Sequence, residues 1–183
     1  MIIRKGTEGD AAAIANLHAE SWRATYRGVL SDDYLDNRVH GERLEIWQKR
    51  FSPTFPKPMF VLLADFSTHL GGFVCVFPEA DATFGSFVDN LHVAQQLHRR
   101  GIGRRLMSEA AGRLLTDGSN SGVYLWVVEQ NQNAQRFYEN AGGIASGPEE
   151  ISTPEGHLVV AFRYHWPDPR LLIVPSSAPD KSK

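Results

Sequence analysis

The segment from Asp89 to Met107, DNLHVAQQLHRRGIGRRLM, constrains the fold more than any other part of the chain. An apolar run that ends in Leu91 and Val93 predicts a strand, and a short polar turn leads from it to a pair of glycines. Apolar residues then recur at every fourth position, which is typical of one stripe of an amphipathic helix (Ile102, Leu106, Ala110 and Leu114). The segment is therefore predicted to be a strand, a glycine turn and a helix.

Four arginines crowd the predicted start of this helix (Arg99, Arg100, Arg104 and Arg105). A helix N-terminus is unfavourable for cations but stabilises phosphate groups, because its first N–H groups are free and glycines let a ligand approach them. This favours a diphosphate ligand; a solvated, arginine-rich helix start is the structural alternative. A Walker A loop does not match, since a single residue separates the glycines, and a dinucleotide fingerprint would need a third glycine at Leu106.

Two motifs resemble those of the GCN5-related N-acetyltransferases. The segment 98–103 (HRRGIG), preceded by 91–93 (LHV), resembles motif A of that family, although His98 replaces the usual Arg or Gln. The segment 131–143 (NQNAQRFYENAGG), which follows a buried strand-like run, is similar to motif B, in which Asn and six further residues precede a Tyr. The resemblance is good from about residue 60 to 165, and the two motifs occur in the family's order.

The resemblance implies an α/β (α+β) fold with one GNAT-like domain over residues 1–166 and a Pro/Ser-rich tail over 167–183. A mixed, mostly antiparallel central sheet of about seven strands, splayed between the fourth and fifth strands, would be flanked by about four helices. The patterns predict strands near 2–3, 59–64, 70–77, 83–93, 123–128, 144–150 and 158–165. They predict helices over 10–22, from 31, from 102 and over 131–140. The tail is expected to be loosely held, although 171–174 is apolar enough to add a strand or dock on a partner subunit.

The resemblance also implies acetyl-CoA (coenzyme A) as the cofactor and names the residues that would hold it. The main chain of Leu91, His92 and Val93 would bind the pantetheine arm and the thioester carbonyl. The diphosphate would lie on the turn and the helix start (Arg99, Arg100, Gly101, Ile102, Gly103 and Arg104). Asn131 and Asn133 are placed to bind the arm, but either could instead be only a helix cap.

Tyr138 occupies the family position that protonates the departing thiolate, and a phenol with a pKa of about 10 suits a thiol of about 8.5. The base is harder to predict. Relatives often carry Glu at the position of Phe87, and ribosomal-protein N-terminal acetyltransferases carry it at that of Trp126, but no acid is present at either. Asp89 is the candidate base, with Glu129 behind it. A base acting through ordered water is equally compatible, and Asp89 could merely pair with an arginine.

Strict alternation along strand 83–93 places Asp89 on one side with three apolar residues (Phe87, Leu91 and Val93), and the alternating residues on the other. In the family, the segment between the first two strands walls the acceptor pocket. Trp22 and Tyr26 are therefore candidates to contact the acceptor, and the alternative is that they fill the core as aromatic residues usually do. The acceptor is expected to be a small-molecule or peptide amine of unassigned identity.

Composition excludes several other classes. A net charge of −2 over 183 residues gives no electrostatic case for nucleic acid, and no apolar run approaches the roughly 20 residues of a membrane span. The N-terminus lacks the apolar core of a signal peptide, which predicts a cytoplasmic protein, with a homodimer possible. The histidines show no metal-site spacing. Cys75, the single cysteine, lies in an apolar run and is expected to be inert, which favours direct transfer over an acyl-enzyme. The alternative class is a non-catalytic acyl-CoA-binding sensor or interaction module.

Overall fold

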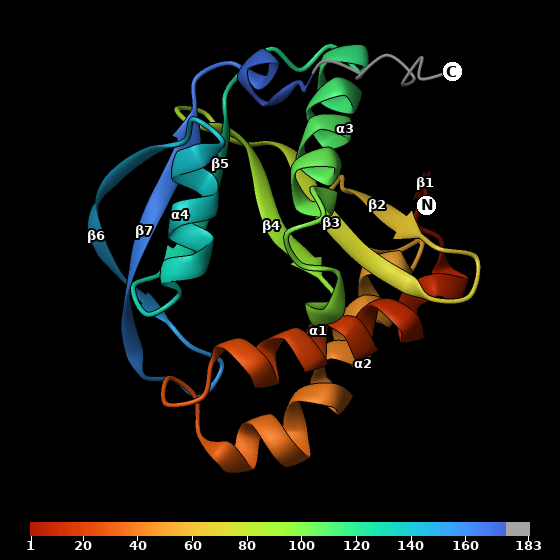
Figure 1. The fold of residues 1–183 in the computed structure, drawn as a ribbon, viewed down its shortest axis with the longest axis vertical. Coiled ribbons are helices and arrows are strands. Elements are labelled where there is room, and N and C mark those ends of the chain that lie inside the picture. Colours follow the sequence, from red (N-terminus) through yellow and green to blue (C-terminus); the bar gives the residue numbers. More distant parts are fainter. Residues whose placement is uncertain (175–183) are drawn as a thin grey trace, which may run out of the picture.

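The protein is built around a twisted sheet. The computed structural model describes residues 1–174 of the chain. The strands are β1 (Ile2–Lys5), β2 (Phe60–Asp65), β3 (Leu70–Asp81), β4 (Gly85–Val93), β5 (Val123–Val128), β6 (Ile144–Ser152) and β7 (Leu158–Trp166). They form one seven-stranded sheet in the order β1-β2-β3-β4-β5-β7-β6 (Figure 1). Every neighbouring pair is antiparallel except β4 and β5, which are parallel. The predicted mixed sheet is therefore confirmed.

The parallel pair β4–β5 opens along its length. Pairing is confined to Ser86 with Val123 and Phe87 with Tyr124, at the start of both strands. From Val88 onward β4 pairs with β3 alone, while β5 continues to pair with β7. Figure 1 shows the two strands diverging toward the end of the molecule where α1 lies. The predicted splay between the fourth and fifth strands is thus confirmed.

Four helices, α1 (Ala11–Thr25), α2 (Val39–Phe51), α3 (Ile102–Thr116) and α4 (Gln132–Asn140), cover the sheet. Successive residues of β3 show which helices share a face. The Cα of Gly72 faces Leu106 of α3, whereas Phe73 packs against His18 of α1 and Trp47 of α2. The helices α1 and α2 therefore lie on one face and α3 on the other, as side-chain alternation along a strand requires.

A β-bulge at Asp89 changes the faces of β4. Cys75 pairs with Asn90 and the next residue of β3, Val76, pairs with Val88, so Asp89 is the extra residue. Beyond the bulge, Val93 lies on the α3 side, where a Cβ at Gly103 would meet it at 3.8 Å. The predicted strict alternation, which put Val93 on the same side as Asp89, is therefore wrong, because the inserted residue shifts the pattern by one position.

The described part of the tail packs on the domain. A 3-10 turn over Pro169–Leu172 buries Leu172, and the main-chain N–H of Val174 donates to Ser108 Oγ of α3 at 2.9 Å. The apolar segment 171–174 thus lies against α3 and adds no strand to the sheet, while 175–183 lies outside the described residues.

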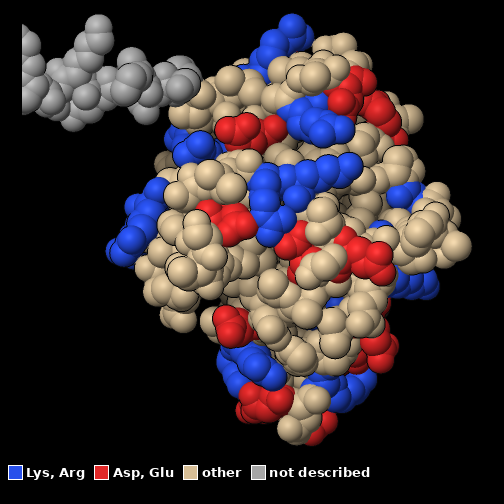
Figure 2. Space-filling view, turned by 90° about the vertical axis from the view of Figure 1, so that its right-hand side faces the viewer, with Lys and Arg blue, Asp and Glu red and all other residues tan. Residues whose placement is uncertain are grey.

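Charge is evenly mixed over the face in Figure 2, where acidic and basic side chains are interspersed. This agrees with the small net charge of the chain, −2. Within residues 1–174, none of the helices has the length and the hydropathy that a bilayer crossing requires.

Candidate active site

A cleft of about 1160 Å³ lies where β4 and β5 diverge. Its walls come from α1, the second half of β4, the turn after β4, the start of α3, β5 and α4. The splay creates the opening, because side chains and main-chain groups of the two strands that would meet in a continuous sheet are held apart. Most of the residues predicted to form the site line this one cleft (Trp22, Tyr26, Asp89, Leu91, His92, Val93, Arg99, Gly101, Ile102, Gly103, Arg104, Asn131, Asn133 and Tyr138).

The turn between β4 and α3 presents main-chain donors to the cleft. Gly101 adopts a left-handed conformation with φ of 74°, and Arg99 does so with φ of 62°, which is uncommon for a side chain larger than hydrogen. Arg105 donates its N–H to the Gly101 carbonyl at 2.9 Å, which begins the helical hydrogen bonding. The N–H groups before it belong to the free first turn of the helix, and among the described residues no side chain caps α3. This arrangement is suited to an anion.

Two contacts fix the position of this turn. His98 Nε2 donates to the carbonyl of Val93 at 2.9 Å, which ties the turn back to the end of β4. Gly103 brings α3 close to α4, since a Cβ there would lie 3.3 Å from Cζ of Phe137. The sequence identified His98 as a departure from the family motif but did not predict a contact for its side chain. The partner is a main-chain carbonyl, and its position depends on how the chain turns after β4.

The arginines of the turn differ in position. Arg99 and Arg104 line the cleft, while Arg100 is exposed and lies outside it. Among the described residues, Arg99 and Arg104 have no carboxylate within ion-pair distance, whereas Arg105 approaches Glu109 at 4.0 Å. Sequence reasoning missed Arg136 of α4, which lines the cleft and adds a further positive charge. The sequence could have indicated Arg136, because it lies two residues before Tyr138 on the same predicted helix.

Tyr138 lies at the inner side of α4. Its ring packs edge-on against Trp166 and obliquely against Tyr164, both of β7, with centroids 6.0 and 5.8 Å away. Burial, and secondly the nearby phenol of Tyr26, raise the pKa of Tyr138 above its usual range. The hydroxyl is therefore protonated at neutral pH, and Tyr138 is one of the residues that line the cleft. Asn131 accepts from Ala134 N at 3.1 Å and is thus the cap of α4.

The second half of β4 forms one wall. Leu91, His92 and Val93 pair with β3 on one side and face the cleft, not β5, on the other. Asp89 also lines the cleft, but its carboxylate is in an ion pair with Arg50 of α2, with Oδ2 2.7 Å from Nη1. The same Nη1 donates to Asn90 Oδ1 at 2.9 Å. The sequence considered an arginine partner for Asp89 without identifying it, because Arg50 is distant in the chain.

The aromatic residues near the N-terminus divide into two groups. Tyr34 and Trp47 are fully buried in the core. Trp22 and Tyr26 instead line the cleft, with their rings in edge contact at 5.2 Å and the Arg43 guanidinium 4.3 Å from the Trp22 ring centroid. The C-terminal half of α1 therefore supplies the wall that the sequence assigned to the acceptor.

Two further residues considered from the sequence, Glu129 and Cys75, do not line the cleft. Glu129, the second candidate base, is exposed in the turn after β5 and does not line the cleft. Cys75 is completely buried in β3, and its burial raises the pKa of the thiol to about 12. The structure thus gives a nucleophilic role for Cys75 no support. In residues 1–174 no cluster of three potential metal ligands occurs.

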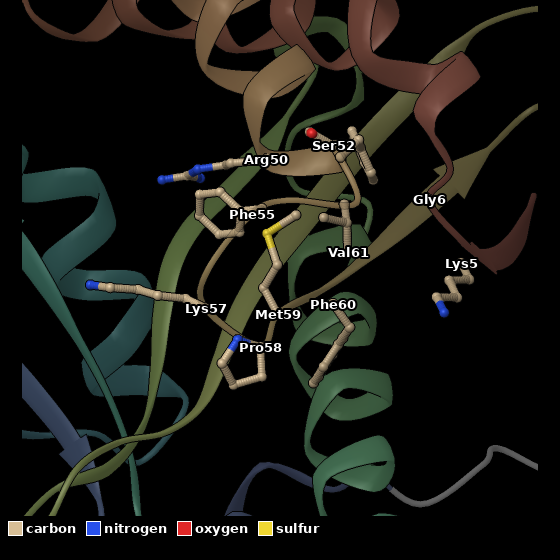
Figure 3. Close-up of a pocket in the computed structure, with 11 residues that line it drawn as sticks. Lys5, Gly6, Arg50, Ser52, Phe55, Lys57, Pro58, Met59, Phe60 and Val61 are labelled. Atoms are coloured by element: carbon tan, nitrogen blue, oxygen red, sulfur yellow. The ribbon is translucent and has the colours of Figure 1, made fainter.

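A smaller hollow of about 300 Å³ lies at the end of α2 (Figure 3). Arg50 and Lys57 extend in the same direction beside Phe55 and Met59, while Lys5 lies at the opposite side of the hollow. It contains no residue of the glycine turn and not Tyr138. The larger cleft is therefore the candidate active site.

The chain belongs to the acetyltransferase (GNAT) family, whose model matches residues 13–143. It is 29% identical over 173 residues to the uncharacterized N-acetyltransferase YuaI of Bacillus subtilis, covering 91% of this chain and 92% of that protein. The fold resembles that of the PaiA N-acetyltransferase of Thermoplasma acidophilum, solved in complex with coenzyme A (TM-score 0.67, 21% identity, 90% of this chain and 98% of that one). It also resembles YncA of Salmonella typhimurium, solved with its cofactor acetyl-CoA (TM-score 0.63, 16% identity, 100% and 99%).

Proposed function

We propose that this acetyltransferase transfers the acetyl group of acetyl-CoA directly to an amine while both are bound. The observation that carries the proposal is the shared cleft. It brings together the free N–H groups at the start of α3, the unpaired edge of β4 and the hydroxyl-bearing side chain of Tyr138. An anion-binding turn alone would suit many phosphate ligands. A splayed strand and a buried phenol in the same cavity suit a long ligand with a diphosphate at one end and a thioester at the other.

The residues present fit acetyl-CoA. The turn supplies free donors for a diphosphate, and Arg99, Arg104 and Arg136 supply positive charge without a competing carboxylate at ion-pair distance among the described residues. The open edge of β4 offers main-chain groups to the amide-containing arm, as a neighbouring strand would. When bound, the cofactor supplies an activated acetyl group. Asn133, exposed beside the cleft, is proposed to bind the arm, while Asn131 is occupied as the helix cap.

The proposed chemistry uses Tyr138 as the acid. Its hydroxyl, kept protonated by burial, donates to the thiolate as the C–S bond breaks. Desolvation in the cleft also disfavours the free thiolate, which raises the pKa of the thiol. This partly offsets the high pKa of the phenol and favours transfer of the proton to sulfur. Main-chain N–H groups of the splayed region of β4 are proposed to hold the carbonyl oxygen as it gains negative charge. Trp22 and Tyr26 are proposed to contact the acceptor.

Isothermal titration with acetyl-CoA, followed by measurement of thiol release on a panel of amines, tests this function. The expected result is saturable binding together with CoA release on at least one amine. Binding without release on every amine would instead favour the non-catalytic acyl-CoA sensor or interaction module. The panel would also identify the acceptor. A cytoplasmic location and a homodimer stay predictions, testable by fractionation and by light scattering.

A further inference from the structure

Two histidines, to whose rings the proposed chemistry gives no role, lie side by side where α1 crosses β4. His18 of α1 is 1% exposed, and its ring centroid lies 4.6 Å from that of His92, with the planes inclined at 34°. Trp47 Nε1 donates to His18 Nδ1 at 3.1 Å. This bond assigns the His18 proton to Nε2, because a neutral imidazole that accepts on one nitrogen carries its proton on the other. His18 is thus a fixed neutral ring against which His92 packs.

His92 differs from His18 because it borders the cleft. Its Nδ1 lies 2.7 Å from Ser21 Oγ, and both residues line the cavity that also contains Tyr138. The tautomer that the proposal below requires is the one in which Nδ1–H donates to the serine oxygen and Nε2 carries the lone pair. The contact with Ser21 and the packing against His18 and Phe73 hold the ring in one orientation. The bulge at Asp89 has a part in this arrangement, since it shifts the side-chain pattern of the strand that follows it.

The surroundings keep His92 uncharged. The groups that face it or its neighbouring ring come from α1, α2 and β3 (His18, Ser21, Trp47, Arg43 and Phe73). Burial, and secondly the positive charge of Arg43, lower the pKa of His92 to about 4. The pKa of His18 is also lowered, mainly by burial. A neutral imidazole in this position keeps its lone pair throughout the physiological pH range.

Asp89 offers a contrast in the same wall. Its carboxylate faces Arg50, whose Nη1 is 2.7 Å from Oδ2. A proton arriving at that oxygen would replace an ion pair that is only partly exposed, with side-chain exposures of 17% for Arg50 and 23% for Asp89. The bonded neighbour of His92 is instead the neutral hydroxyl of Ser21. Of the two groups, Asp89 is the one held in an ion pair, although its Oδ2 accepts no hydrogen bond within residues 1–174, and His92 is the one bonded to a neutral partner.

We propose that His92 takes the proton from the acceptor amine and that Ser21 orients it. The inference rests on the proposed amine acetylation. The amine nitrogen forms a bond to the thioester carbonyl carbon, the C–S bond breaks, and the sulfur receives the Tyr138 proton. The proton lost by the nitrogen goes to Nε2 of His92. After attack the nitrogen is cationic and strongly acidic, so a weakly basic imidazole is a sufficient acceptor. Solvent then returns His92 and Tyr138 to their starting states.

The test uses His92→Gln with the best amine from the panel. The side-chain amide keeps a partner for Ser21 but cannot take a proton, so kcat is expected to fall about 100-fold. The acetyl-CoA Kd, measured by titration, is expected to stay within about twofold because the ring is proposed to act on the amine. His92→Ala should regain part of its activity when imidazole is added at fixed pH, and stronger small bases should rescue more. A purely structural role would not produce a rescue that follows base strength.

Ser21 provides a second variant that leaves the β-sheet intact. Ser21→Ala is expected to lower kcat about tenfold by freeing the ring, whereas Ser21→Thr, which keeps the hydroxyl, should retain most of the parent rate. His69→Gln, a matched change at an exposed loop histidine, controls for the loss of an imidazole. An active parent with full kcat in both His92→Gln and Ser21→Ala would overturn the role of His92 and leave the acetylation intact. Loss of kcat in Asp89→Asn but not in His92→Gln would assign the proton to the carboxylate. A parent inactive on every amine would overturn both proposals.

Discussion

His98 and Val93 are joined across the turn that leads from β4 into α3, where the ring Nε2 donates to the main-chain carbonyl at 2.9 Å. The carbonyl lies at the last residue of β4, and the donor lies just before the glycine turn. The bond therefore fixes the distance between the splayed strand and the free N–H groups. The side chains usual at this position in the resembled family, Arg and Gln, are also hydrogen-bond donors, so the histidine conserves the chemistry of the position.

Replacing His98 should separate the effect of the donor from that of its shape. His98→Ala is expected to weaken acetyl-CoA binding about fivefold, close to the free energy of one hydrogen bond, because the turn loses its tie to β4. His98→Gln keeps a donor of similar reach and should bind within about twofold of the parent. Isothermal titration measures both. Equal affinities for His98→Ala and the parent would show that the turn holds its conformation without this contact.

Tyr138→Phe should cut kcat about 100-fold and leave the acetyl-CoA Kd nearly unchanged. The ring that packs against Tyr164 and Trp166 is preserved, and only the proton donor is lost. Tyr164→Phe is the matched control, since its hydroxyl bonds Glu139 at 3.1 Å and does not line the cleft. Steady-state rates of CoA release check the comparison. A parent-like rate in Tyr138→Phe would remove this side chain from the acid role.

Arg104→Gln should weaken acetyl-CoA binding about fivefold at low salt, because it removes one charge beside the diphosphate. The difference is expected to shrink in 0.5 M NaCl, where exposed charges are screened. Arg113→Gln, near the other end of α3, is the control because its charge is paired with Asp117 at 2.6 Å outside the cleft. Titrations at two salt concentrations give the measurement. A salt-independent loss would point to packing and not to charge.

Cys75 should be silent in catalysis. It is fully buried and the pKa of its thiol is raised to about 12, so almost none of it is thiolate at neutral pH. Iodoacetamide is expected to label the protein only after denaturation, as mass spectrometry would show. Cys75→Ala should keep the parent kcat, although it will lower the melting temperature by leaving a small cavity. A loss of kcat larger than unfolding explains would support a mechanism with an acyl-enzyme on Cys75.

Asp10 should contribute to stability at neutral pH and lose that contribution in acid. Arg4 lies 2.7 Å from its carboxylate and lowers the pKa of Asp10 to about 2. Because the unfolded value is about 3.9, the stabilisation is complete above that pH and is lost as the pH falls toward 2. Asp10→Asn is expected to cost about 1 kcal/mol at pH 7 after allowance for solvent screening. Urea unfolding should show the gap from the parent closing below pH 4.

The sequence predicted the individual strands and helices because strand and helix patterns, glycine turns and caps are local. The sequence also predicted the mixed sheet, its splay and most of the cleft residues, but only through the resemblance of the motifs around Gly101 and Tyr138 to those of the family. What it could not predict depends on register and on distant partners. The bulge at Asp89 changes which side chains share a face, and Arg50, which pairs with Asp89, comes from a helix that no local pattern connects to β4.

The short seam between β4 and β5 has a mechanical consequence. In the described chain, two residue pairs and the stacked rings of Phe87 and Tyr124, 5.1 Å apart, are what join the two half-sheets along these strands. A molecule lying in the gap and bonding to both edges would behave as an eighth, non-covalent strand. Amide hydrogens on the facing edges of β4 and β5 would then all exchange with solvent more slowly. The bound molecule would also hold the two half-sheets together.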